Sequence, residues 1–198
     1  MIRAIIFDYF GVVRPEGAGL RSIYRYLGGD VQKDEPFIAD VTTAANYGFI
    51  TDAEEQLAQH LGISVDQWNT AAKIIQRKDP AVVDYILELR ARGLKTGLLS
   101  NAGKNMLSKY FAPDDLHTYF DYFVSSGDVG LIKPEAAFYR FMAEKLGVTP
   151  EECVMVDDRE EFVVGATSIG MQGVHYQHFD QFKHDLEALL ANVADKNS

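Results

Sequence analysis

The chain has 198 residues, of which 47% are hydrophobic and 24% are charged, as is typical of a soluble globular protein. This length suits one sizeable domain, or one core domain that carries a smaller insertion. The formal net charge is −10, and the 19 basic residues form no cluster. We therefore expect neither a nucleic acid nor an anionic membrane as a partner, because binding to both depends on clustered basic residues.

The single cysteine, Cys153, excludes an internal disulfide and a cysteine-based zinc cluster. The N-terminus lacks the basic start and the apolar stretch of a signal peptide, and no apolar run is long enough to cross a bilayer. We expect a cytoplasmic protein, and its oligomeric state is not defined by the sequence.

The chain opens with a short apolar run that predicts a buried strand. Ile5, Ile6 and Phe7 are β-branched or aromatic, and the run is too short for an independent helix. It stops at a carboxylate, Asp8, and Gly11 then lets the chain turn sharply. Ligands of open α/β sheets bind beyond the carboxyl ends of the strands, so Asp8 is a candidate site residue.

Residues 14–78 show helical patterns and no convincing strand. The segment 20–27 can form one helical face before a glycine pair. Thr51-Asp-Ala-Glu54 is a capping-box sequence, which predicts a helix from there to about His60. Ser64-Val-Asp-Gln67 repeats this pattern and predicts the start of a further helix.

From Asp79 onward, strand and helix patterns alternate, and Asp79 itself is placed to cap the first helix. The predicted strands are residues 94–99, the segment around Val124, 153–156 and 173–176, and the predicted helices are 80–92, 136–146, 162–169 and 179–192. This alternation predicts an α/β fold with a doubly wound parallel sheet. We interpret residues 1–13 and 79–198 as the core domain and residues 14–78 as a small helical cap inserted after the first strand.

Polar groups occupy comparable positions in this pattern. Asp8, Ser100 and the pair Asp157-Asp158 each come directly after an apolar strand, and Lys133 opens a helix after the third strand. Because the carboxyl ends of parallel strands meet at one edge of a sheet, we expect these side chains to form one site.

The chemistry of this set is that of phosphoryl transfer. Three carboxylates placed close together raise one another's pKa unless a cation is present, and Mg²⁺ prefers oxygen ligands. The metal and Lys133 can neutralise a phosphate whose oxygens bind Ser100 and the backbone N–H groups near Gly11. Asp8 can then attack phosphorus and form an aspartyl-phosphate that water hydrolyses.

These residues, in this order, resemble the four motifs of the haloacid dehalogenase (HAD) superfamily, and the resemblance covers nearly the whole chain. The matching segments are Phe7-Asp8-Tyr9-Phe10-Gly11-Val12-Val13, Leu98-Leu99-Ser100-Asn101, Gly130-Leu131-Ile132-Lys133-Pro134-Glu135, and Val154-Met155-Val156-Asp157-Asp158 with Gly165-Ala166 after it. The resemblance implies a Rossmann-like core, a small cap of type C1 and membership of the phosphatase-like branch of subfamily I.

The resemblance also implies a role for each site residue. Asp8 is the expected nucleophile, and Lys133 is the expected catalytic residue that balances charge. The expected ligands of the Mg²⁺ cofactor are Asp8, Asp157, Asp158 and the backbone carbonyl of Phe10. The expected ligands of the substrate, a small phosphorylated metabolite such as a sugar phosphate, are Ser100, Asn101 and Lys133.

Phe10 departs from the family pattern. Most phosphatases of this family have a second Asp there, which acts as general acid and base, and phenylalanine cannot transfer a proton. Three functions stay open. The first is a phosphatase whose leaving group needs little protonation, such as a sugar 1-phosphate, or which borrows an acid from the cap or the substrate. The others are a 2-haloacid dehalogenase and a catalytically impaired protein that binds metal or phosphate. A dehalogenase needs no metal, so the Asp157-Asp158 pair argues against it.

Overall fold

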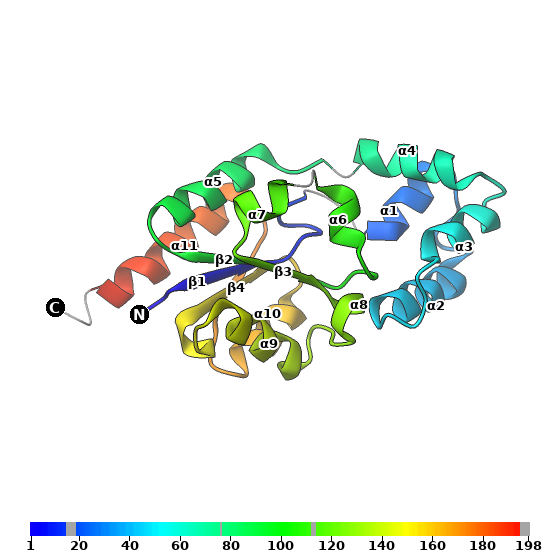
Figure 1. Cartoon of the computed structure of the whole chain (residues 1–198). Coiled ribbons are helices and arrows are strands. Elements are labelled where there is room, and N and C mark those ends of the chain that lie inside the picture. Colours follow the sequence, from blue (N-terminus) through cyan, green and yellow to red (C-terminus); the bar gives the residue numbers. More distant parts are fainter. Residues whose placement is uncertain (15–18, 76, 112–113, 195–198) are drawn as a thin grey trace.

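The computed structural model describes residues 1–14, 19–75, 77–111 and 114–194. Its centre is a five-stranded sheet with the strand order β3-β2-β1-β4-β5 (Figure 1). The strands are β1 (Ala4–Phe7), β2 (Lys95–Ser100), β3 (Tyr122–Ser125), β4 (Cys153–Asp157) and β5 (Gln172–His175). Every pairing between neighbouring strands is parallel, which confirms the predicted α/β fold.

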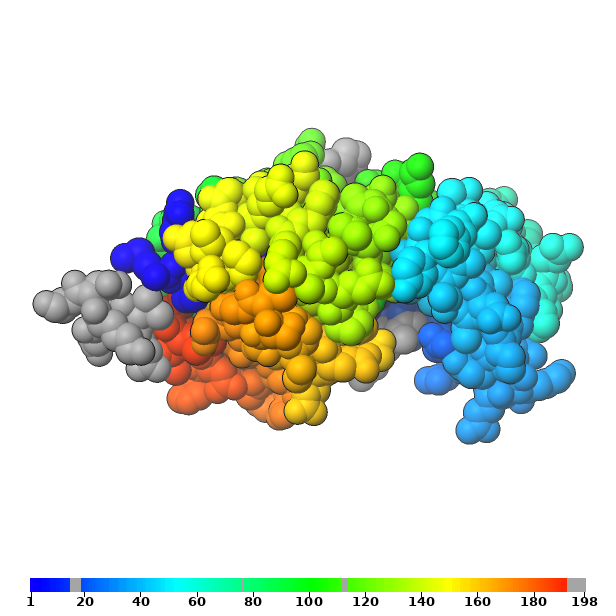
Figure 2. Space-filling model, turned by 90° about the horizontal axis from the view of Figure 1, so that it is seen from below, coloured from blue at the N-terminus to red at the C-terminus, as the bar shows by residue number. Residues whose placement is uncertain are grey.

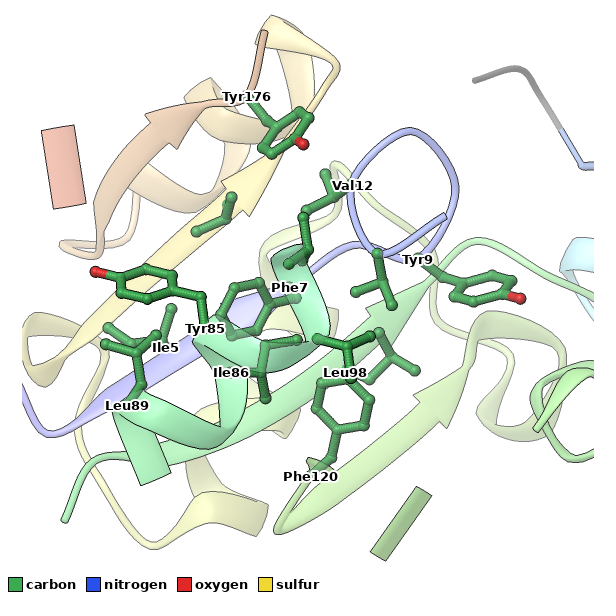
Figure 3. Packing of buried hydrophobic residues seen from close by; sticks show 14 of the residues in the cluster. Ile5, Phe7, Tyr9, Val12, Tyr85, Ile86, Leu89, Leu98, Phe120 and Tyr176 are labelled. Atoms are coloured by element: carbon green, nitrogen blue, oxygen red, sulfur yellow. The ribbon is translucent and has the colours of Figure 1, made fainter. Parts of the chain in front are cut away.

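Helices cover both faces of this sheet (Figure 1). The helices on one face are α5 (Pro80–Ala91), α7 (Asp115–Tyr119) and α11 (Phe179–Ala194), and those on the other are α9 (Ala136–Leu146) and α10 (Glu160–Thr167). Side chains of β1 alternate between the two cores: Ile5 and Phe7 pack under the first group, and Ala4 and Ile6 under the second. Figure 3 shows Phe7 among the buried side chains of the first core.

Four helices that precede α5 pack together beyond the carboxyl edge of the sheet. They are α1 (Gly19–Tyr26), α2 (Glu35–Asn46), α3 (Ala53–His60) and α4 (Val65–Ile75), and we call them the cap. Their buried cluster centres on Tyr24, Leu57 and Trp68 and also includes Ala102 and Met106 of the core. The cap therefore rests on the core through shared apolar contacts. The predicted domain boundaries at residues 13/14 and 78/79 stay a prediction.

Short elements complete the core between the strands. They are α6 (Met106–Tyr110), α8 (Ser126–Val129) and the 3₁₀ helix η1 (Pro150–Glu152). In the part of the chain that the structure describes, no helix has both the length and the apolar character that crossing a membrane requires.

The local predictions for the cap succeeded in part. The capping box at Ser64 forms, because the Gln67 N–H donates to Ser64 Oγ at 3.2 Å and the Ser64 N–H donates to Gln67 Oε1 at 2.9 Å. The capping box at Thr51 is wrong: α3 begins at Ala53, and its N-cap is Asp52 without a side-chain cap bond. Asp52 accepts from the Gln56 side chain instead, at 3.0 Å.

Helix α2 has no counterpart among the predicted elements. Its sequence, EPFIADVTTAAN, contains two adjacent threonines, and only three of its residues are buried. Helix propensity and amphipathicity are both weak in such a segment. Its position follows from packing against α3 and the core, which a local pattern does not reveal.

Candidate active site

Asp8 comes directly after the central strand β1, and it is 5% exposed. Its backbone N–H donates to the carbonyl of Val156 in β4 at 2.9 Å, so the ladder continues to the site. Asp157 ends β4, and Asp158 follows it. Because the two strands pair in register, the three carboxylates meet at one edge of the sheet. One carboxylate oxygen of each lies within 4.8 Å of the others.

Lys133 joins two of these carboxylates. Its Nζ donates to Asp8 Oδ1 at 2.8 Å and to Asp157 Oδ2 at 2.6 Å, and Lys133 is 2% exposed. The ring centroid of Phe162 lies 5.0 Å from the same Nζ. A buried cation thus lies between two buried carboxylates. Removal of one partner from such a group destabilises the fold strongly, because it leaves a buried charge without a counter-charge.

Asn101 holds the backbone of Lys133. Its Nδ2 donates to the Lys133 carbonyl, and its Oδ1 accepts from the Lys133 N–H, both at 2.9 Å. Asn101 also lines the cavity described below. This placement gives Asn101 a positioning contact with Lys133, and its predicted contact with substrate stays a prediction.

Ser100 is the last residue of β2 and is fully buried. Among the described residues, no group forms a hydrogen bond with its Oγ. A buried hydroxyl without a partner costs about 1–3 kcal/mol, so such groups in native proteins usually have a ligand, water or ion as partner. Ser100 Oγ therefore has the capacity for a further hydrogen bond. Ser100 is not among the residues that line the cavity described below, and its predicted contact with phosphate stays a prediction.

The titration behaviour of the cluster reflects its burial. Burial raises the pKa of Asp8 to about 7 against the opposing effect of Lys133, and Asp157 adds to the rise. Burial, followed by the charge of Asp157, also raises the pKa of Asp158. Burial disfavours the Lys133 cation, but Asp157 and Asp8 outweigh that effect and raise its pKa above the usual value. Lys133 is therefore charged at neutral pH.

This donor set fits a hard divalent cation. When ionised, the carboxylates of Asp8, Asp157 and Asp158 together with Lys133 leave an excess of two negative charges, which Mg²⁺ would cancel. Gly11 belongs to the same arrangement, with φ +91°, and a Cβ there would lie 2.1 Å from Asp158 Oδ2. The glycine is required both by this backbone conformation and by the carboxylate beside it.

A cavity of about 210 Å³ opens beside Asp8. The core contributes Lys133 and Asp158 to its lining, and the cap contributes Thr42 and Asn46 of α2 among others. Figure 2 shows the surface hollowed between the blue-to-cyan cap and the core. The candidate site is therefore roofed by the cap.

Phe10 also lines this cavity. Its side chain packs against both the first core cluster and the buried cluster of the cap. Its ring centroid lies 4.8 Å from that of Tyr9, and a Cβ at Gly19 in α1 would lie 3.2 Å from its Cζ. Phe10 thus provides an apolar contact between core and cap. None of the described lining residues is a histidine, glutamate, cysteine or tyrosine.

The sequence that builds this fold and site matches the model of a known family. The model of haloacid dehalogenase-like hydrolases matches residues 2–170. The chain belongs to the haloacid dehalogenase-like hydrolases. The recognition made from the four motifs is thereby confirmed, and so is the expectation of a hydrolase.

Curated relatives of this hydrolase include phosphatases. The putative phosphatase YhcW of Bacillus subtilis (strain 168) is 26% identical, over 96% of this chain and 93% of the relative. Phosphatase MT3486 of Mycobacterium tuberculosis is 36% identical, over 43% of this chain and 40% of the relative. The glyceraldehyde 3-phosphate phosphatase of Methanothermobacter thermautotrophicus is 28% identical, over 50% of this chain and 44% of the relative. This chain thus aligns with less than half of the latter two relatives.

Solved structures show the same fold. A HAD family enzyme of Bacteroides thetaiotaomicron, crystallised with magnesium and inorganic phosphate, has a TM-score of 0.72 at 20% identity and covers 89% of this chain and 95% of its own. A predicted HAD-like family hydrolase of Porphyromonas gingivalis has a TM-score of 0.76 at 23% identity, with coverages of 96% and 98%. At these identities the likeness shows the fold alone.

The motifs of this hydrolase revealed its strand-end residues but not the residues that the cap contributes. Arg21, Thr42 and Asn46 line the cavity from α1 and α2. None of these three residues belongs to one of the four motifs, and no pattern in the sequence predicted α2. Arg159 lines the cavity from the core side, and its guanidinium stacks 4.4 Å from the ring centroid of Phe162. The one sequence feature that could have identified Arg159 as a site residue is its position directly after Asp158.

Proposed function

We propose that this hydrolase is a Mg²⁺-dependent phosphatase that acts on a small phosphorylated metabolite through an aspartyl-phosphate on Asp8. The observation that carries the proposal is the cluster of three carboxylates within 4.8 Å of one another, with the buried Lys133 bonded to two of them. The phosphatases among the curated relatives support it.

In the proposed reaction, Lys133 orients the Asp8 carboxylate through Oδ1 and favours its ionised form, which is the form that attacks. Asp8, Asp157 and Asp158, with the backbone carbonyl of Phe10, would hold Mg²⁺, which supplies the positive charge that a phosphate needs near an acidic protein. Ser100 Oγ and the backbone N–H groups after Asp8 would bind phosphate oxygens. A bond forms between Asp8 and phosphorus while the ester oxygen leaves, and water then releases phosphate from Asp8.

The function is tested by phosphate release from a panel of small phosphomonoesters, with Mg²⁺ and with EDTA. We expect release from at least one ester, only in the presence of Mg²⁺. Halide release from 2-chloropropionate without phosphate release would replace the proposal with a dehalogenase. Absence of both reactions, with Mg²⁺ binding retained, would indicate a catalytically impaired binding protein.

The missing proton donor predicts unusual kinetics with p-nitrophenyl phosphate. Its leaving group needs little protonation, so phosphorylation of Asp8 should be fast, whereas the water that attacks the aspartyl-phosphate has no Asp at position 10 to activate it. Stopped-flow measurement should show a burst of about one p-nitrophenolate per site before a slower steady state. Phe10→Asp should raise the steady-state rate about tenfold or more and diminish the burst.

Phe10→Leu is the matched control, because it changes the contact with the cap but adds no acid. If Phe10→Leu accelerates turnover as much as Phe10→Asp does, the effect comes from packing and the proton-transfer argument is wrong. Unchanged steady-state rates in both variants would show that the missing acid does not limit this enzyme.

Gly11→Ala is expected to weaken Mg²⁺ binding at least about tenfold, because the new methyl group displaces Asp158. It should also destabilise the fold by about 1 kcal/mol or more, through the positive φ. Gly93→Ala is the control, with φ +84° and nothing within 4 Å of the added Cβ. Calorimetric titration with Mg²⁺ should separate them: both variants lose stability, and only Gly11→Ala loses affinity. Equal affinities would contradict the assignment.

Mg²⁺ affinity should depend on pH through Asp8. The pKa of this residue is raised by burial to about 7, so below that pH the metal must displace a proton. The apparent association constant should rise about tenfold per pH unit below pH 7 and level off above it. Titrations between pH 5.5 and 8.5 in buffers of different ionisation enthalpy would count the released protons. Binding that is independent of pH would contradict a role for Asp8 as ligand.

The remaining predictions concern the setting of the enzyme. We keep residues 14–78 as the cap domain and residues 1–13 and 79–198 as the core domain, and we keep the cytoplasm as the expected location. A small phosphorylated metabolite is the proposed partner, with a sugar phosphate as one candidate.

A further inference from the structure

The roof of the cavity carries a buried polar group that the proposed reaction does not use. Thr42 lies in the middle of α2 and lines the cavity that contains Asp8. Its Oγ1 is buried, and within the described residues it has no hydrogen-bond partner. Asn46 lies one helical turn further on and lines the same cavity. A threonine and an asparagine thus lie on one face of α2, and both line the cavity.

The cations in the lining are already paired with carboxylates. Arg21 of the cap forms two hydrogen bonds with Glu35, and Arg159 forms an ion pair with Glu161. Lys133 is bonded to Asp8 and Asp157. Part of a substrate that extends from the phosphate toward α2 would therefore meet the neutral hydrogen-bonding groups of Thr42 and Asn46. A second anion would have to compete with Glu35 or Glu161 for an arginine.

The size and the remaining lining restrict the substrate further. A cavity of about 210 Å³ is smaller than the roughly 300–1,000 Å³ of sites for drug-sized ligands. Phe10, Leu20 and Met106 give its lining an apolar share, against which carbon atoms can pack. A short carbon chain with hydroxyl groups satisfies both kinds of surface.

We propose that Thr42, together with Asn46, determines substrate specificity by binding hydroxyl groups of the esterified part of the substrate. The inference rests on the proposed phosphatase function and defines its substrate class as a monophosphate ester of a short, neutral polyol. Because Phe10 supplies no proton, the leaving oxygen of such an ester takes its proton from water or from a neighbouring hydroxyl group of the substrate. Sites built to bind a hydroxyl discriminate against analogues that lack it, because the buried protein groups are then left unpaired.

The test compares two esters with the same carbon skeleton, glycerol 1-phosphate and n-propyl phosphate. We expect wild type to prefer the first. In Thr42→Val, which removes the hydroxyl but keeps the shape, the ratio of the two kcat/KM values should fall about five- to tenfold. Thr42→Ser keeps a hydroxyl and should restore most of the ratio. Thr43→Val is the matched control, because Thr43 is the exposed neighbour on α2 and should leave the ratio unchanged.

An unchanged ratio in Thr42→Val, or an equal fall in Thr43→Val, would overturn the inference. Faster hydrolysis of 2-phosphoglycolate than of glycerol 1-phosphate would also overturn it, because the esterified part would then be anionic. Mg²⁺-dependent hydrolysis of p-nitrophenyl phosphate reports on the proposed function separately.

If wild type hydrolyses no ester, the proposed function fails but the inference is still decided by binding. Calorimetry with Mg²⁺ and Asp8→Asn, with and without Thr42→Val, gives the dissociation constants of glycerol 1-phosphate and n-propyl phosphate. A preference for the glycerol ester that Thr42→Val abolishes supports the inference. Equal dissociation constants for the two esters overturn it.

Discussion

Asp8→Asn is expected to lower kcat/KM for phosphate release by about a thousandfold or more. The substitution keeps the shape of the side chain but removes the oxygen that would attack phosphorus. Asp8 has a pKa raised by burial to about 7, so its ionised form is unfavourable in the metal-free fold. The variant should therefore fold at least as stably as wild type when metal is absent, and loss of activity would not reflect unfolding.

Phosphate release and thermal unfolding, both measured at pH 7.5, check this prediction. Asp84→Asn is the control, because Asp84 is exposed on α5 and distant in sequence from every site residue. Its activity should equal that of wild type. An Asp8→Asn variant that retains more than about a tenth of the wild-type rate would exclude Asp8 as the nucleophile.

Lys133→Met is expected to destabilise the metal-free protein by about 3–5 kcal/mol at pH 8 and to abolish activity. Removal of the cation leaves Asp8 and Asp157 buried without their partner. The pKa of Lys133 is raised in the fold, so its stabilising contribution is fully present at neutral pH and is lost only at high pH, as Lys133 itself deprotonates. The deficit of the variant should shrink at pH 5, where carboxylates with raised pKa take up protons.

Urea unfolding in EDTA at pH 5 and pH 8 measures the loss of stability of the variant at each pH. The control is Lys183→Met, because Lys183 is a partly exposed lysine that pairs with Glu88 at 3.5 Å and lies 4.6 Å from the ring centroid of Tyr85. Exposed pairs of this kind contribute little to stability. Similar free energies of unfolding for the two variants would show that Lys133 does not balance buried charge.

The core of the site was predictable because its determinants are local. A buried strand that stops at a polar residue places that residue at the sheet edge, and parallel pairing brings such edges together. Asp8, Asp157 and Asp158 meet for this reason. The bonds from Lys133 to two of these carboxylates follow from the same edge, since the helix that it precedes starts beside the third strand.

The cap was less predictable because tertiary packing decides it. Helix α2 has weak helical signals, and the position of Thr42 in the cavity depends on how α2 packs on the core. The predicted cap at Thr51 failed because Asp52, one residue later, precedes the helix. The bonds of Asn101 to the Lys133 backbone could not be inferred either, since both residues lie in loops 32 positions apart.

Phe10 leaves the site without a proton donor but provides an apolar contact between core and cap. The sequence indicated the missing proton donor, and the structure adds that the ring packs between Tyr9 and α1 at the border of core and cap. An aspartate there would forfeit that apolar contact. Phe10→Asp is thus expected to cost some stability as well as to change the kinetics.

The central claim is a covalent phosphoryl group on Asp8, and peptide mass spectrometry after acid quenching tests it most directly. Wild type is mixed with Mg²⁺ and p-nitrophenyl phosphate and quenched during steady-state turnover, when slow hydrolysis should let the intermediate accumulate. We predict a phosphoryl adduct on Asp8 that is absent in EDTA and in Asp8→Asn. Continued phosphate release with Asp8 unmodified at every time point would contradict the account.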